Sequence, residues 1–198
     1  MKQILIAISL LFLSGCTMTK PYITEYKIST KEVQIKHDVG GCRDKTMKIA
    51  QAFSEKSLMS SMMDYTQSGN KVFSYTESQW QETPNHAITA YMYNEIKESA
   101  IFKSVLNSRS VSKSDMILEI TIEEFMQHYS FDMKELYSSV VVSLAVVDAK
   151  TNSIVATKTF KSKVDSKKLN ADGGVEALSS ALADISEKSI EWLSGVCK

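Results

Sequence analysis

Catalytic and metal-binding chemistry would have to be built from few residues in this chain, which contains three histidines and three cysteines. His37, His86 and His128 are scattered and lack the HExxH spacing that places two zinc ligands on one helix face. No GxSxG turn is present, and no SxxK occurs with the companion motifs of a penicillin-binding site. A GxxxxGK[ST] loop, which would hold nucleotide phosphates, is also missing. We therefore expect no enzymatic activity, no ATP hydrolysis, no metal and no cofactor.

Cys16 is the cysteine with the clearest chemical context. After one basic residue, the chain runs apolar from Ile4 to Leu13, interrupted by a single serine. This run is too short to span a bilayer as a helix, which needs about 20 residues, but it suits the core of a signal peptide. It ends in Leu13-Ser14-Gly15-Cys16, which resembles the lipobox of bacterial lipoproteins. We expect residues 1–15 to be a cleaved signal peptide and Cys16 to become the lipidated first residue.

The lipobox resemblance also implies a membrane and a leaflet. Bacterial lipoproteins carry a diacylglycerol and an N-acyl chain on this cysteine, with palmitate among the acyl groups. One acyl chain gives only reversible attachment, whereas several hold a protein permanently. Thr17 follows Cys16, while lipoproteins retained at an inner membrane often have Asp there. The resemblance implies the periplasmic face of the outer membrane, with residues 16–41 as lipidated cysteine and tether.

Cys42 and Cys197 are the remaining cysteines, and they lie near the two ends of the expected folded part, residues 42–198. An exported chain meets an oxidising compartment, where such a pair is expected to form a disulfide. Free or metal-bound thiols are the alternative interpretation. Titration of thiols before and after reduction distinguishes the two.

A group of aromatic residues lies between the expected hairpin and the first helix. It contains Tyr65, Phe73, Tyr75 and Trp80. If exposed, these side chains would form a contact patch for a partner protein. If buried, they would cap the core of the sheet, and the sequence favours neither interpretation.

The composition is that of one packed domain. The 198 residues are 43% hydrophobic and 23% charged, which argues against intrinsic disorder. Basic and acidic residues balance to a formal net charge of zero, so no basic excess favours nucleic acid as a partner.

The apolar patterns predict strands and two helices. Apolar and polar residues alternate from Met116 to Glu123, which predicts a strand with one solvent-exposed face. The stretch from Val140 to Val147 is apolar on both faces, which predicts a central strand covered on both sides. A partner strand is expected from Ile154 to Val164. Further strands are expected at 45–53, at 58–65, at 71–75 and, as a short edge strand, at 22–28.

Two helical patterns complete the chain. Pro84 opens the first helix, and Ile88, Tyr91, Met92 and Ile96 recur at helical spacing. Asp172 is the expected N-cap of the second helix. Its apolar stripe comprises Val175, Leu178, Leu182, Ile185, Ser189, Trp192 and Val196. The order of elements predicts an α+β two-layer sandwich, with two main helices on one face of a mostly antiparallel or mixed sheet.

Several segments, taken in order, resemble the ABC-type transport auxiliary lipoproteins, a group that includes PqiC-like proteins. They are the lipobox, Trp80-Gln81-Glu82-Thr83-Pro84, Phe102-Lys103-Ser104-Val105, Ser114 to Ile120, Glu124-Phe125 and Glu191-Trp192-Leu193. The family usually has Trp-x-x-Pro, and here Trp80 and Pro84 are one residue further apart.

The family resemblance implies a function. Such lipoproteins work with MCE-domain proteins and ABC permease and ATPase components that move lipids or other hydrophobic molecules between membranes. The lipoprotein is a docking component, and some members form homo-oligomeric rings. A second hypothesis is a periplasmic lipoprotein that itself binds a lipid or glycolipid in a cavity beneath the sheet.

Overall fold

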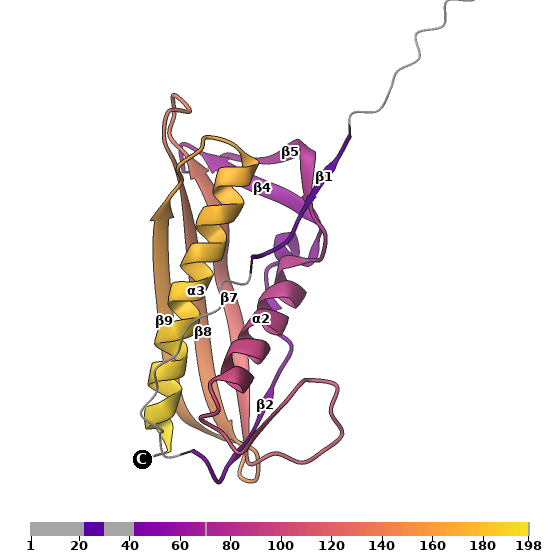
Figure 1. The fold of residues 1–198 in the computed structure, drawn as a ribbon, viewed down its shortest axis with the longest axis vertical. Coiled ribbons are helices and arrows are strands. Elements are labelled where there is room, and N and C mark those ends of the chain that lie inside the picture. The colour runs from indigo at the N-terminus through magenta and orange to yellow at the C-terminus, as the bar shows by residue number, and fades with distance from the viewer. Residues whose placement is uncertain (1–21, 30–41, 70, 198) are drawn as a thin grey trace, which may run out of the picture.

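The computed structural model describes residues 22–29, 42–69 and 71–197. Within them, one mixed sheet of nine strands carries two long helices on one face (Figure 1). The predicted α+β sandwich is therefore confirmed. Cys16, the signal peptide at 1–15 and most of the tether at 16–41 lie outside the described residues.

The sheet is organised around its longest strand, β7 (Met116–Tyr129). On one side, β8 (Leu136–Asp148) pairs antiparallel with β7 along its length. On the other side, β2 (Thr46–Ile49), β3 (Phe53–Ser54) and β4 (Met62–Gln67) pair with it in succession, all parallel. The parallel pairs bring segments that are distant in sequence onto one strand.

The remaining strands extend the sheet at both sides. β9 (Ser153–Asp165) pairs antiparallel with β8, and β5 (Lys71–Trp80) forms a hairpin with β4. β6 (Ser104–Leu106) lies beside β2. β1 (Thr24–Tyr26) pairs parallel with the end of β5, which confirms the expected edge strand. A short 3-10 helix, η2 at 56–59, connects β3 to β4.

A β-bulge at Glu123 changes which side chains of β7 face the core. Before it, Leu118, Ile120 and Ile122 point inward, as the alternation predicts. The register shifts between Ile122 and Glu124, so the inward positions after the bulge are the odd-numbered ones. Gln127 and Tyr129 are consequently buried on the helix side.

The prediction for β8 is half right. The strand is central, because it lies between β7 and β9. Its inward residues, Val140, Val142, Leu144 and Val146, are fully buried beneath the helices. The expectation that both faces are covered holds only in part for the described residues: on the opposite face Val141 is buried, whereas Ala145 and Val147 are half-buried. Antiparallel sheets commonly keep one such solvated face.

The helices form where the periodicity predicts. α2 (Pro84–Glu98) begins with proline in its first turn, where the missing N–H has no partner to lose. α3 (Ala171–Val196) buries the predicted stripe from Val175 to Ser189 against β8 and β9. In its last turns Leu193 is buried, while the predicted Trp192 and Val196 are only half-buried. In the described part of the chain, neither helix has both the length and the apolar character to cross a membrane.

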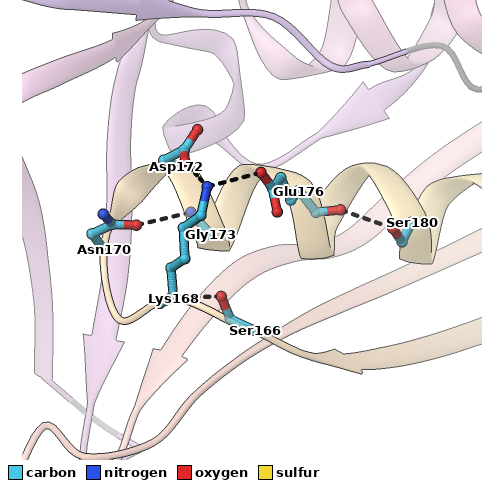
Figure 2. Close-up of polar contacts among 7 residues, drawn as sticks. All are labelled: Ser166, Lys168, Asn170, Asp172, Gly173, Glu176 and Ser180. Carbon is cyan, nitrogen blue, oxygen red and sulfur yellow. Dashed lines mark hydrogen bonds and ion pairs between the residues drawn. The ribbon is translucent and has the colours of Figure 1, made fainter.

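The predicted N-cap of α3 is wrong by two residues. Asn170 holds that position, and its Oδ1 accepts a hydrogen bond from the Gly173 N–H at 3.0 Å (Figure 2). Asp172 instead lies in the first turn, where its carboxylate pairs with the Lys168 ammonium at 2.5 Å. Both Asn and Asp cap helices well, and an acidic residue in the first turn is also favoured by the helix dipole.

Candidate functional site

The structure joins Cys42 and Cys197, which are 155 positions apart in sequence, in a disulfide with Cα atoms 5.2 Å apart. Cys42 precedes β2 and is fully buried, and Cys197 directly follows α3. The bridge therefore ties the end of the last helix to the beginning of the central part of the sheet.

Three of the four predicted aromatic residues meet in one cluster, together with Tyr129. The Tyr65 ring lies 5.6 Å from Phe73, 4.7 Å from Tyr75 and 5.2 Å from Tyr129 between ring centroids. Phe73 is 40% exposed and the tyrosines are partly or largely buried. This aromatic cluster (Tyr65, Phe73, Tyr75 and Tyr129) thus combines a fixed interior with one side chain open to solvent.

Trp80 does not belong to the aromatic cluster, and of the two interpretations left open for it, the structure favours burial in the core over a partner-binding patch. It is 5% exposed, and its ring packs 5.7 Å from that of Phe125 in the core between sheet and helices. Trp80 is the last residue of β5, where the strand turns inward toward α2. Trp80 is therefore part of the buried core of the sheet and not of an exposed contact patch.

Hydrogen bonds fix the tyrosines of the cluster. The Tyr75 hydroxyl lies 2.8 Å from Gln127 Oε1 and 3.0 Å from the Tyr129 hydroxyl. Burial, together with the contact to Tyr129, raises the pKa of Tyr75, and burial also raises the pKa of Tyr129. Both hydroxyls therefore stay protonated at neutral pH and serve as hydrogen-bonding groups rather than as bases.

A hollow of about 440 Å³ opens beside the aromatic cluster. Its walls come from Tyr75, Tyr129, Thr24 of β1 and Leu169-Asn170 before α3. A helix start can bind anions through free N–H groups, but here the Gly173 N–H already bonds to the Asn170 side chain (Figure 2). The Gly174 N–H bonds to the Asn170 carbonyl oxygen. Glu77 and Asp172 also line this hollow, so its surface does not suit an anion.

The close approach of α3 to β7 depends on Gly174, because a Cβ there would overlap the Gln127 side-chain amide. Gly174→Ala would displace this buried amide and its bond from Tyr75, and should lower the free energy of unfolding by about 2 kcal/mol. Gly195→Ala, where nothing lies within 4 Å of a new Cβ, is the matched control. Helix propensity predicts that it stabilises by about 0.5 kcal/mol. Urea unfolding, monitored by circular dichroism, measures the free energy of unfolding of both variants. Equal changes in the two variants would contradict the packing argument.

A second hollow, of about 270 Å³, lies between β1 and α2. Tyr26, Ile28, Trp80 and Tyr91 line it. The Tyr91 hydroxyl is buried and has no hydrogen-bond partner among the described residues. Burial raises the pKa of Tyr91, so this hydroxyl is a neutral donor.

A polar network crosses the outer face of the sheet, and sequence spacing gave no sign of it. His128 Nδ1 lies 2.7 Å from the Thr66 hydroxyl, and its Nε2 lies 2.8 Å from Glu124 Oε1. Ser139 donates to the other Glu124 oxygen at 2.8 Å. A hydroxyl, an imidazole and a carboxylate in this order resemble a nucleophile, its base and an orienting acid. Thr66 is only 7% exposed, however, so its hydroxyl is shielded from a substrate, and the network joins β4, β7 and β8 instead.

Thr66→Val tests that structural role, because valine keeps the shape and removes the hydroxyl. The variant leaves one imidazole nitrogen without its partner, so the free energy of unfolding should fall by about 1 to 2 kcal/mol. Ser74→Ala, on the neighbouring strand and exposed, should change stability by less than about 0.5 kcal/mol. The measurement is the denaturant concentration at the midpoint of unfolding, compared between proteins whose unfolding free energy has the same dependence on denaturant. An unchanged midpoint for Thr66→Val would contradict the structural role of the network.

Comparison with protein-family models finds no match, and neither does comparison with curated proteins. Several solved structures share the fold. A DUF330 protein from Xanthomonas campestris superposes with a TM-score of 0.71 at 13% identity, covering 87% of this chain and 92% of its own. An uncharacterized protein of known structure reaches 0.67 at 12% identity, over 87% and 99%. The PelC dodecamer from Paraburkholderia phytofirmans reaches 0.50 at 13% identity, over 79% and 91%. At these identities the comparisons establish a common fold.

Proposed function

We propose that this protein is a lipid-anchored accessory component of an ABC/MCE-type transport system that moves lipids or other hydrophobic molecules between membranes. It acts as a docking adaptor on the periplasmic face of the outer membrane, with MCE-domain and ABC permease and ATPase components as its partners. The observation that carries the proposal is the lipobox ending at Cys16, followed by an ordered set of segments resembling auxiliary lipoproteins. The similarity in fold to a DUF330 protein over most of both chains supports it.

The aromatic cluster provides a surface for docking. Phe73 projects from it with 40% exposure, and Tyr65 stacks against Phe73 from the neighbouring strand. Rigid aromatic side chains at the centre of an interface often supply much of its binding free energy. A partner that covers Phe73 would bury apolar area without reorganising the sheet.

The burial and the protonation of the polar groups agree with a role without catalysis. The arrangement around His128 that resembles a catalytic relay has its hydroxyl buried at Thr66. The tyrosines at the larger hollow are neutral donors and acceptors. These groups suit binding better than bond cleavage.

Assembly into a homo-oligomeric ring is part of the proposal. PelC, with a related fold, is a dodecamer. In this chain, β9 pairs only with β8 among the described strands and carries exposed Ile154 and Val155 near its start. An open strand edge with apolar side chains is suited to contact with a second copy.

The alternative function, direct storage of a lipid beneath the sheet, has less support. The space between sheet and helices is filled by buried side chains of β7, β8 and α3. The hollows beside β1 are open at the surface and hold about 270 and 440 Å³. Mass spectrometry of lipid that copurifies in stoichiometric amount would favour this alternative.

Affinity capture from crosslinked envelopes tests the docking role. The wild-type protein should recover an MCE-domain protein and an ABC permease. Phe73→Ser should recover several-fold less of both, whereas Val111→Ser, fully exposed in the loop between β6 and β7, should recover wild-type amounts. Recovery of neither partner by the wild type would contradict the proposal.

A further inference from the structure

Three exposed apolar side chains lie at one end of the molecule. Phe131 is 81% exposed and Met133 39% exposed in the turn between β7 and β8, and Leu169 is 50% exposed in the loop before α3. Figure 1 shows this turn and this loop at the same end of the long axis. Leu169 also lines one hollow together with Lys134 of this turn. We name Phe131, Met133 and Leu169 the apolar tip.

The turn that carries Phe131 and Met133 has a defined conformation. Ser130 Oγ accepts hydrogen bonds from the N–H groups of Lys134 and Glu135 at 3.1 and 3.0 Å, and donates to Asp132 Oδ1 at 2.8 Å. Met133 has a φ of 58°, in the left-handed region that residues with a side chain seldom adopt. The hydrogen bonds therefore hold a strained turn in which two large apolar side chains point into solvent.

The position of Cys16 in the sequence bears on which end of the domain would face the membrane. Among the described strands, β1 is nearest to Cys16 in sequence, and it begins at the same end of the long axis as the apolar tip (Figure 1). Thr24 of β1 and Leu169 also border the same hollow. Eight residue steps separate Cys16 from Thr24, and a fully extended chain covers at most about 29 Å in eight steps. If Cys16 carries the lipid, the beginning of β1 lies within that distance of the bilayer.

Acidic and basic side chains near the apolar tip nearly balance: Lys134, Glu135, Lys163 and Asp165 line the hollow beside Leu169, and several of the charges at this end form ion pairs. Lys134 lies 3.4 Å from Asp132, and Lys168 lies 2.5 Å from Asp172 and 3.2 Å from Glu176. Such pairing leaves little net field to attract anionic headgroups, so attraction to a lipid surface has to come from the apolar side chains.

We infer that the apolar tip inserts into the interface of the leaflet that holds the lipid anchor, which fixes the orientation of the domain on the membrane. This inference rests on the proposed function, because it requires the anchor at Cys16. The occupant is a phospholipid surface: Phe131, Met133 and Leu169 enter the boundary between headgroups and acyl chains. Two attachments, the acyl chains and the apolar tip, then hold the domain in one orientation.

The test uses the mature lipidated protein in phospholipid vesicles with brominated acyl chains, which quench tryptophan fluorescence on contact. Phe131→Trp places a probe in the apolar tip at nearly unchanged shape. Val111→Trp places the same probe in an exposed loop at the opposite end of the long axis (Figure 1). The emission of wild-type Trp80 and Trp192 is subtracted. Flotation of the vesicles reports the anchor independently.

The added emission of Phe131→Trp should shift to the blue and be quenched at least twofold more than that of Val111→Trp. The quenching should be equal in zwitterionic vesicles and in vesicles that contain anionic lipid. Equal quenching of both probes in floated protein, or quenching that needs anionic lipid, overturns the inference and leaves the anchor intact. Protein that does not float overturns both the inference and the proposed anchor.

Discussion

Cys197→Ser should lower the free energy of unfolding by about 3 to 5 kcal/mol, because the bridge to Cys42 closes a very long loop in the unfolded chain. With the cysteines 155 positions apart in sequence, the chain-entropy model gives an upper value of about 5 kcal/mol. Cys197 is half-buried and directly follows α3, so serine there disturbs packing less than at fully buried Cys42. Urea unfolding monitored by circular dichroism measures the loss.

Reductant provides the control for this prediction. Dithiothreitol should bring the wild-type protein to the stability of Cys197→Ser and should leave the variant unchanged. A wild-type protein with two titratable thiols before reduction, and no response to dithiothreitol, would contradict the bridge.

Trp80→Ala should have a similarly large effect, about 3 to 5 kcal/mol, because removal of a buried tryptophan leaves a cavity in the core. The ring packs on Phe125 and is only 5% exposed. Water therefore cannot replace the packing contacts that are lost when alanine takes its place. The melting temperature should fall accordingly. Partner capture should decrease only in proportion to the unfolded fraction.

Phe131→Ala is the matched control for Trp80→Ala, since it removes an aromatic ring of similar size that is 81% exposed. Its effect on stability should stay within about 0.5 kcal/mol. Lost partner capture by Trp80→Ala with an unchanged melting temperature would restore Trp80 to the docking surface and contradict the core assignment.

Local patterns were sufficient to predict most of the fold. The apolar periods of α2 and α3 and the alternation at the start of β7 reflect which faces are buried, and the structure confirms them. The bulge at Glu123 could not be predicted, because Glu123 and Glu124 are equally polar and either could face solvent. Burial of Gln127 and Tyr129 follows from this single inserted residue.

The contacts around the candidate site come from pairing between distant strands, which local patterns do not encode. Tyr129 joins Tyr65 because β4 pairs parallel with β7. The same pairing brings Thr66 to His128, 62 residues away. The composition of the aromatic segment was visible in the sequence, but the separation of Trp80 from Phe73 depends on the path of β5.

The proposed function depends most on acylation of Cys16, and incorporation of radiolabelled palmitate measures this acylation directly. Cells that express the wild-type protein should yield a labelled band that fractionates with the outer membrane. Cys16→Ser should yield an unlabelled precursor that retains residues 1–15. An unlabelled wild-type band, or a Cys16→Ser protein that is fully processed, membrane-bound and active, would contradict the account.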